Sequence, residues 1–305
     1  MTNLLAIDAP AAIDRIRAAI ASGCRGLNRR GAVVGISGGV DSAVCAALAV
    51  RALGAERVLG VLMPEKDCSD EGTQRAMRLC DQLGIEALRE DLTAPLEALR
   101  CYGRRDDAMR RLFPDYGEGW RQKIVLSGGP LDSARLAWFD AVVENPAGER
   151  RRARMPADVY REVVAASNMK QRLRALLVYT HAEARNRAVI GTPNRLEYEL
   201  GFFVRGGDGM GDIKPIAHLF KTQVYAVAAA LDIPEEIRGR APSTDTYTLD
   251  QSQEEFYFGL NLGLLDLLLA ARAAGWDAAR AARASGLDEA AVARVWHDVE
   301  GKRRA

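Results

Sequence analysis

The amino-acid composition is that of a globular chain without a charge bias. Its 305 residues are 48% hydrophobic, which suffices for one large core or for two smaller ones. With 42 Lys and Arg against 41 Asp and Glu, the net charge of +1 gives no electrostatic case for a nucleic-acid or membrane partner. The sequence shows no leader pattern and no run of about 18 apolar residues, so we expect a cytoplasmic protein with no membrane association.

The N-terminal part of the chain predicts alternating strands and helices. Short apolar runs alternate with stretches whose apolar residues have helical spacing, which is typical of an α/β protein. We therefore predict a doubly wound parallel sheet with helices on both faces. The expected elements are helices over residues 10–28, 43–53 and 76–83, and strands over residues 32–36, 58–63 and 85–88. Ligands collect at the carboxyl ends of such strands, so the loops 37–42 and 64–72 should face one crevice.

The stretch SGGVDS, which follows the first strand, has the composition of a phosphate-binding turn. A strand that turns through Gly38 and Gly39 into a helix leaves backbone N–H groups unpaired at the positive end of the helix dipole. Ser37 and Ser42 can add hydroxyl donors. Asp41 would repel a phosphate unless a divalent cation lies between them, so it predicts Mg²⁺.

Other interpretations of this turn fit less well. A Walker-type loop needs a lysine after the glycines, and a dinucleotide fingerprint needs GxGxxG; the sequence has neither here. A plain turn capped by Ser or Asp is the remaining alternative. It gives no reason to combine two serines, two glycines and an aspartate. We therefore refer to residues 37–42 as the phosphate loop.

Residues 102–166 interrupt the alternating pattern. The stretch is rich in charge, prolines and glycines, and it resembles an insertion more than a further strand and helix. We expect a surface loop or a small helical subdomain. The alternative is a lid or a substrate-specificity element, in which Trp120 or Trp138 stacks on a ring. Regular structure resumes with a helix from Asn168 and a strand over residues 188–190.

The second half of the chain adds charged residues that would complete a nucleotide site. Glu197 follows a strand end near the crevice of Asp41, and two carboxylates from separate strand ends make a sensible Mg²⁺ site. Lys221 opens a helix and would neutralise charge on a phosphate. Taken alone, Glu197 is better explained as a solvated helix acid, and Lys221 is equally well explained as a surface lysine at a helix start. The glycine-rich residues 205–212 are expected to form a loop that presents Asp208.

The phosphate loop resembles the pyrophosphate loop of the ATP pyrophosphatases, and further segments are similar to those of the ammonia-dependent NAD synthetases. GTPNRLEYELGFF and VRGGDGMGDIKP match two patterns of that family, and NMKQRLR and LFKTQV match two more. The four matches stand in family order and at near-family spacing. Two departures are residues 102–166, where the family has a shorter link, and Arg205, where it has lysine. An arginine keeps the charge but changes the hydrogen-bond geometry.

The resemblance implies one Rossmann-like ATP pyrophosphatase domain over residues 1–305, with an inserted charged and helical segment at 102–166 and a helical part at 251–305. It implies a ligase that forms a C–N bond. ATP, with Mg²⁺, adenylates the nicotinate carboxylate of deamido-NAD and releases pyrophosphate, and ammonia then gives NAD and AMP. It also implies a homodimer, and either free ammonia or a separate glutaminase as the nitrogen source.

The resemblance also assigns roles to individual residues. Catalysis is assigned to Asp41, Lys221 and Asp208. Mg²⁺ is assigned to Asp41 and Glu197. ATP is assigned to Ser37, Gly38, Gly39, Ser42, Thr192, Lys221 and Ser243. The acid substrate is assigned to Asn168, Arg172, Arg205, Asp208 and Glu255.

The identity of the acid that is amidated is the least determined part of this expectation. Residues 102–166, Arg205 and the aromatic residues 256–258 motivate an alternative in which the same ATP chemistry amidates a different carboxylate. A nucleotide-binding relative without catalysis is a second alternative, against which the charged residues of the site argue. A tRNA-modifying enzyme is a third, which the balanced charge disfavours.

Overall fold

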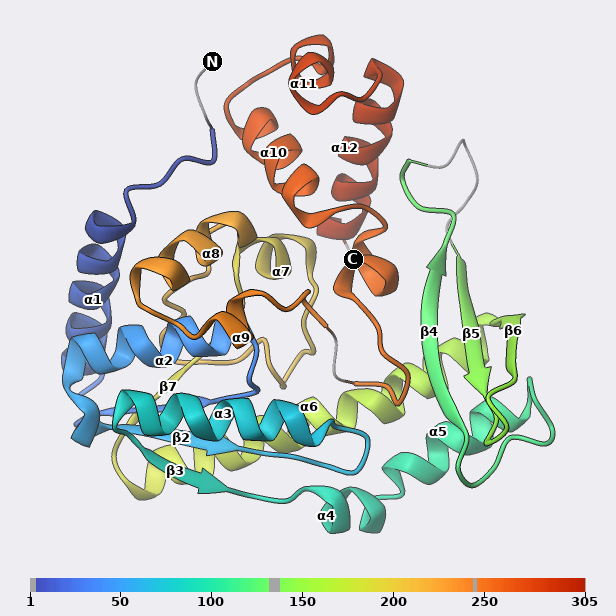
Figure 1. Cartoon of the computed structure of the whole chain (residues 1–305), viewed down its shortest axis with the longest axis horizontal. Coiled ribbons are helices and arrows are strands. Elements are labelled where there is room, and N and C mark those ends of the chain that lie inside the picture. Colours follow the sequence, from blue (N-terminus) through green and yellow to red (C-terminus); the bar gives the residue numbers. More distant parts are fainter. Residues whose placement is uncertain (1–3, 132–137, 244–245, 305) are drawn as a thin grey trace.

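The centre of the fold is a parallel sheet of four strands (Figure 1). A computed structural model describes residues 4–131, 138–243 and 246–304. The strands are β1 (Ala32–Gly35), β2 (Val58–Leu62), β3 (Glu86–Arg89) and β7 (Ala188–Ile190). They lie in the order β3, β2, β1, β7, and Ala32 pairs with Val58 on one side and with Ala188 on the other. The predicted parallel sheet is confirmed.

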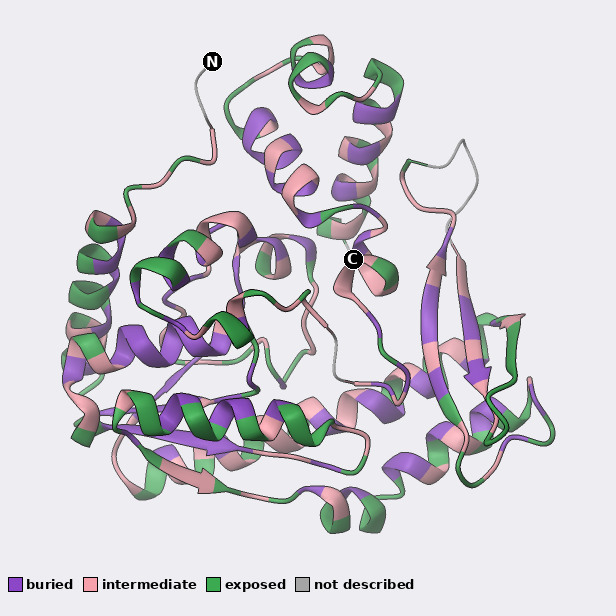
Figure 2. Cartoon of the chain, viewed as in Figure 1, coloured by how far each residue is buried: buried purple, intermediate pink, exposed green. Residues whose placement is uncertain are grey.

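Helices cover both faces of this sheet. One face packs against α1 (Ala9–Gly26), α2 (Val40–Leu53), α3 (Asp70–Leu83) and α8 (Lys221–Ala230), and the other against α6 (Ala157–Ala184). Alternate residues of β1 divide between the two cores, since Val34 joins the first and Val33 packs with Val178 of α6. Strands β1 and β2 are consequently buried along almost their whole length (Figure 2). The doubly wound arrangement is confirmed.

Helices α3 and α6 begin well before the positions that the sequence pattern predicted. Helix α3 begins at Asp70 and not at residue 76, because the Ser69 hydroxyl accepts a hydrogen bond from the first turn and caps the helix. Helix α6 begins at Ala157 and not at Asn168. Its added turns carry buried valines that pack against a second, smaller sheet.

That second sheet is formed by residues 121–154 of the predicted insertion (Figure 1). It has three antiparallel strands, in the order β4 (Arg121–Ser127), β5 (Trp138–Glu144) and β6 (Arg150–Arg154). The expectation of a surface loop or a small helical subdomain is corrected for this stretch, of which residues 132–137 lie outside the described part. Ile124 and Val143 form a core with α5 (Cys101–Arg110) and α6. Charged side chains at the outward-facing positions hid the strand period in the sequence.

The C-terminal part is helical. Helices α10 (Leu262–Ala273), α11 (Ala278–Ser285) and α12 (Glu289–Arg304) form a core together with Leu196, Leu200 and Phe220, and the short helix η2 (Glu254–Phe258) leads into them. The remaining short helices are η1 (Ala55–Arg57), α4 (Thr93–Ala98), α7 (Arg195–Leu200) and α9 (Glu235–Arg238). Among the helices of the described ranges, none combines the length and the apolar character needed to cross a membrane.

The core between the sheet and α6 should respond strongly to cavity formation. Leu59 of β2 is 0% exposed, so Leu59→Ala is expected to lower the free energy of unfolding by about 2–5 kcal/mol. Leu99→Ala is the matched control, because Leu99 is 49% exposed; its effect should stay below about 0.5 kcal/mol. Urea unfolding followed by circular dichroism measures both. Equal stability losses in the two variants would contradict the packing described here.

Candidate active site

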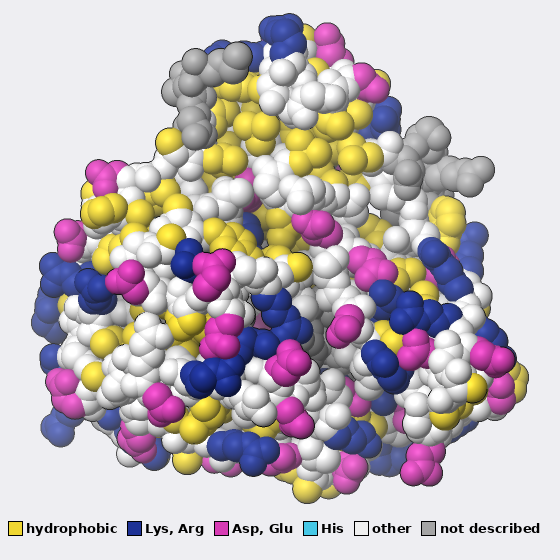
Figure 3. Space-filling view, viewed as in Figure 1, with side chains coloured by type: hydrophobic (Ala, Val, Ile, Leu, Met, Phe, Trp, Pro, Cys, Tyr) yellow, Lys and Arg dark blue, Asp and Glu magenta, His cyan; other side chains and the backbone are white. Residues whose placement is uncertain are grey.

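A cleft lies at the carboxyl ends of β1, β2 and β7, where a sheet of this kind collects ligands. It consists of two adjoining cavities, a smaller one of about 280 Å³ and a larger one of about 340 Å³. The residues that line both are Ser37, Ser42, Gln171, Thr192, Asp208 and Ser243. The face shown in Figure 3 has a hollow near its centre, with acidic and basic side chains intermixed around it.

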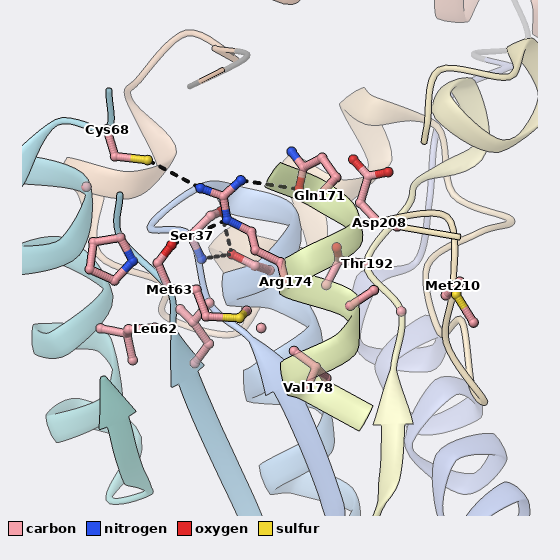
Figure 4. Close-up of a pocket in the computed structure, with 18 of the residues that line it drawn as sticks. Ser37, Leu62, Met63, Cys68, Gln171, Arg174, Val178, Thr192, Asp208 and Met210 are labelled. Carbon is pink, nitrogen blue, oxygen red and sulfur yellow. Dashed lines mark hydrogen bonds between the residues drawn. The ribbon is translucent and has the colours of Figure 1, made fainter. Parts of the chain in front are cut away.

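The smaller cavity lies directly over the strand ends (Figure 4). Met63 follows β2, and Val178 and Arg174 come from α6. The guanidinium of Arg174 is fixed across the cavity, with Nε donating to Met63 O at 3.3 Å and Nη2 to Cys68 Sγ at 3.4 Å. An apolar floor with a few fixed polar groups suits a planar ring with polar edges.

The phosphate loop joins the two cavities. Its hydroxyls are pre-arranged, since Ser37 Oγ and Ser42 Oγ lie 3.2 Å apart and Ser42 Oγ donates to Gly39 O at 3.0 Å. Gly38 has φ +81°, and a Cβ there would lie 2.4 Å from Gly72 O at the start of α3. At Gly39 the nearest atom of the described residues to a Cβ would be Ser37 Oγ, at 3.4 Å. Gly38 is therefore needed for the approach to α3, and Gly39 leaves space on the ligand side.

Three charged residues from separate elements meet beside this loop, as the sequence predicted. Lys221 Nζ forms an ion pair with Asp41 Oδ2, and Asn194 Nδ2 donates to Asp41 Oδ1 at 3.2 Å. Asn194 also caps α7, where its backbone N–H donates to Glu197 Oε2 at 3.0 Å. Gln253 Nε2 donates to Glu197 Oε1 at 3.2 Å. One asparagine thus connects the two carboxylates.

The cluster carries two acids for one base, and its electrostatics reflect that excess. Burial, and next the charge of Asp41, raise the pKa of Glu197 to about 8. Burial opposes ionisation of Lys221, but Asp41 and Glu197 outweigh it and raise the pKa of the lysine. A divalent cation held between the two carboxylates would relieve their repulsion, and two carboxylate ligands suit Mg²⁺. The described residues contain no group of three or more His, Cys, Asp or Glu arranged to hold a metal ion.

All of the residues predicted for ATP and metal line the cleft. Thr192 and Ser243 line both cavities, and Lys221 and Glu197 line the larger one. Of the residues predicted for the acid, Asn168 lines the larger cavity. Asp208 lines both, and its Oδ1 accepts a hydrogen bond from Val204 N at 2.7 Å.

Three residues predicted for the acid lie elsewhere. Arg172, Arg205 and Glu255 line neither of the two cavities in the described part of the chain. Arg172 and Arg205 are exposed, and Arg172 Nε donates to Arg205 O at 3.1 Å. Glu255 pairs with Lys123 of β4 at 2.7 Å. Their assignment to the substrate stays a prediction.

Two arginines of the larger cavity were missed by the sequence analysis. Arg75 of α3 and Arg240 both line it. Arg75 is 7% exposed, and its Nε, like Nη1 of Arg240, is buried without a hydrogen-bond partner among the described residues. Buried guanidinium groups beside a phosphate loop suit an anion. No local pattern marks them, because each looks like an ordinary surface arginine in the sequence.

A buried ionic network fixes the loop 64–72 beside the cleft. Lys170 of α6 is 1% exposed and donates to Glu65 Oε1 at 3.0 Å, to Asp67 Oδ2 at 2.6 Å and to Thr246 O at 3.0 Å. Burial works against ionisation of Asp67, but Lys170 and Arg105 outweigh it and lower its pKa. The lysine therefore connects two loops that lie far apart in the sequence. It belongs to the NMKQRLR segment, but its role there was not predicted.

Comparison with protein families confirms the resemblance noted in the sequence. A family model described as NAD synthase matches residues 12–110 and 148–303. It skips residues 111–147, which include β4 and β5. The departure from the family pattern is therefore centred on the second sheet.

Individual relatives agree with the family match. The NH(3)-dependent NAD(+) synthetase of Rhizobium meliloti (strain 1021) is 50% identical over 303 residues, which cover 99% of this chain and 90% of that protein. Its alignment thus spans residues 111–147 as well.

Solved structures share the fold at lower identity. NMN synthetase from Francisella tularensis superposes with a TM-score of 0.66 at 23% identity, covering 98% of both chains. NH3-dependent NAD synthetase from Campylobacter jejuni gives a TM-score of 0.62 at 21% identity, covering 97% of this chain and 95% of that one. These likenesses support the α/β fold, and the matches to the family model and to the Rhizobium relative show that the chain belongs to the NAD synthase family.

Proposed function

We propose that this protein is an ATP-dependent amide synthetase that converts deamido-NAD and ammonia into NAD. The observation that carries the proposal is the meeting of Asp41, Glu197 and Lys221 beside the phosphate loop, in a chain that is 50% identical to an NH(3)-dependent NAD(+) synthetase. A carboxylate is a poor acylating group until one of its oxygens is phosphorylated or adenylated. The cleft has the groups needed to place ATP for that step.

The smaller cavity is the proposed site of the adenosine of ATP. Its apolar floor and the fixed guanidinium of Arg174 suit a base and a ribose. The phosphates would then extend along Ser37, Gly39 and Ser42 toward the larger cavity, where Arg75 and Arg240 face the leaving pyrophosphate. Thr192 and Ser243 line both cavities and would contact the nucleotide at the junction.

Asp41 and Glu197 would hold Mg²⁺. When bound there, the ion would neutralise phosphate charge on ATP. Lys221 would add a fixed positive charge at the phosphates, which becomes more valuable as negative charge develops on the leaving group. The protein needs no covalent nucleophile for this chemistry; it positions the reactants and stabilises charge.

The larger cavity is the proposed site of the acid. Its aromatic side chains can accommodate the nicotinate ring, and Asn168 and Asp208 supply polar contacts. Attack of the carboxylate on the α-phosphate would release pyrophosphate, and ammonia would then displace AMP from the mixed anhydride. Arg172 and Arg205 are also proposed for the acid, whereas the carboxylate of Glu255 is engaged by Lys123 of β4. Since both arginines are exposed, we propose that they act in a homodimer.

The source of the ammonia and the place of the enzyme in the cell are further proposals. We infer that the enzyme works in the cytoplasm and uses free ammonia or ammonia from a separate glutaminase. The relatives named NH(3)-dependent favour ammonia as the direct nitrogen donor. They also disfavour a different carboxylate, a non-catalytic role and a tRNA substrate.

A reconstituted reaction tests the proposed function. Purified protein with MgATP, ammonium and deamido-NAD is expected to form NAD, AMP and pyrophosphate in equal amounts, as measured by chromatography. Nicotinate mononucleotide in place of deamido-NAD is the comparison, and it should react more slowly. Pyrophosphate release with another acid, together with no NAD formation, would overturn the proposal.

Removal of the cleft lysine should affect the chemical step. Lys221→Met is expected to lower kcat by about 100- to 1,000-fold, because a fixed charge beside the phosphates is lost. Its folding should be verified by circular dichroism, since the change leaves Asp41 unpaired. Arg17→Gln on the exposed side of α1 is the control and should keep full activity. A kcat for Lys221→Met close to that of the control would show that the lysine has no catalytic role.

The metal requirement should depend on Glu197. Chelation with EDTA is expected to abolish activity, and Glu197→Gln should raise the Mg²⁺ concentration for half-maximal rate about tenfold or more. Glu199→Gln on the same helix is the matched control, because Glu199 pairs with Arg195 and Arg303 instead of lining the cavities. An unchanged Mg²⁺ requirement in Glu197→Gln would place the ion elsewhere.

A further inference from the structure

Residues 246–258 form part of the wall of the larger cavity; we call them the acceptor segment. Tyr247, Gln253 and Phe256 of this segment line the cavity. Gln253 Nε2 also donates to Glu197 Oε1 at 3.2 Å. The position of the acceptor segment therefore determines the shape of the acid side of the cleft and one hydrogen bond to the proposed metal site.

Strand β4 of the second sheet runs beside this segment and binds it. Gln122 N donates to Thr248 Oγ1 at 2.6 Å, and Leu249 N donates to Gln122 O at 3.1 Å. The buried Gln251 side chain donates from Nε2 to Ile124 O. Because β4 contributes backbone groups to all three bonds, its position fixes the course of the acceptor segment.

An ion pair adds to these bonds. Lys123 Nζ lies 2.7 Å from the carboxylate of Glu255, and it donates to Asp250 O at 3.2 Å. The side chains of Lys123 and Glu255 are 16% and 39% exposed, so the pair is partly shielded from water. This contact explains why Glu255 lines neither cavity, since its carboxylate is engaged by the second sheet.

Phe139 of β5 supports the aromatic wall of the larger cavity from outside. Its ring stacks on Tyr160 with the centroids 4.4 Å apart, and it lies 6.4 Å from the ring of Phe256. Phe256 in turn lies 6.0 Å from Phe202. The rings of Tyr160, Phe256 and Phe202 line the cavity, whereas the ring of Phe139 does not. A change at Phe139 would shift rings that face a ligand without removing a direct contact to it.

We propose that the strand pair β4 and β5 is a positioning element for the acid substrate. Lys123 and Phe139 of this pair hold the acceptor segment and the aromatic wall of the larger cavity in place. The cavity can then receive a planar aromatic carboxylate. This rests on the proposed function, in which the acid occupies the larger cavity. It assigns Glu255 to docking through Lys123 and not to contact with the acid. The two strands lie within residues 111–147, which the family model skips, so the element is not part of the pattern common to the family.

A charge-exchange series in the full-length protein separates the two roles of Glu255. Lys123→Glu and Glu255→Lys are each expected to raise the KM for deamido-NAD about tenfold while the KM for ATP stays within about twofold. The double variant Lys123→Glu/Glu255→Lys should return the KM for deamido-NAD to within about threefold of wild type. If the double variant is as impaired as Glu255→Lys alone, Glu255 contacts the acid directly and the docking role is wrong.

A second variant tests the aromatic support. Phe139→Leu should raise the KM for deamido-NAD about fivefold with little change in kcat, because a ring contact behind the wall is lost. Arg150→Gln on β6 is the matched control, because Arg150 pairs with Glu144 at 2.7 Å within the same sheet. This substitution should leave both KM values unchanged. Equal effects of the two variants on both KM values would reduce the second sheet to a general stabilising role.

Hydrogen exchange makes the outcome independent of the proposed reaction. Without any substrate, Lys123→Glu and Phe139→Leu should speed amide exchange in residues 246–258, and Arg150→Gln should not. Unchanged exchange in that segment would overturn the positioning element even if the wild-type protein makes NAD. If the two variants show faster exchange but the wild-type protein makes no NAD, the proposed function alone is contradicted and the positioning element stands.

Discussion

Lys221 and Asp41 form a buried ion pair where the phosphate loop meets α8, and the geometry of the cleft depends on it. Their side chains are only 3% and 17% exposed, and burying two charges is costly unless further hydrogen bonds satisfy both groups. Asn194 donates to Asp41, while Asp266 of α10 accepts from the backbone N–H groups of Lys221 and Thr222. The end of β1, the cap of α7, the start of α8 and the C-terminal helices are thereby joined at one point.

Two further lysines hold the walls of the cleft, and like Lys221 each joins elements that are distant in the sequence. Lys170 connects the loop 64–72 to Thr246, and Lys123 connects the second sheet to Glu255. Neither cavity is therefore shaped by a single element. The core of the domain supplies the phosphate side, and the second sheet, with the acceptor segment, supplies the acid side. Among these elements, the family model covers the central sheet, β6 and the acceptor segment, and it skips β4 and β5.

The sequence allowed the phosphate side to be predicted well and the acid side poorly. A short strand followed by SGGVDS is a local pattern, and the rule that ligands collect at strand ends placed Glu197 near Asp41. Lys221 was assigned to the phosphates by the family resemblance, and the structure pairs it with Asp41. The second sheet pairs with Thr248, 126 residues after Gln122, and the arginines on its outer positions concealed the strand period. Buried lysines and arginines such as Lys170 cannot be told from solvated ones without the tertiary contacts that surround them.

The central claim is that the cleft brings the carboxylate of the acid to the α-phosphate of ATP, and oxygen transfer tests it most directly. Deamido-NAD labelled with ¹⁸O at both carboxylate oxygens would be converted with MgATP and ammonium, and the products analysed by mass spectrometry. The account predicts one ¹⁸O in AMP and one in the new amide, because the bridging oxygen leaves with AMP. An ¹⁸O label in orthophosphate and none in AMP would contradict it, since the acid would then have attacked the γ-phosphate.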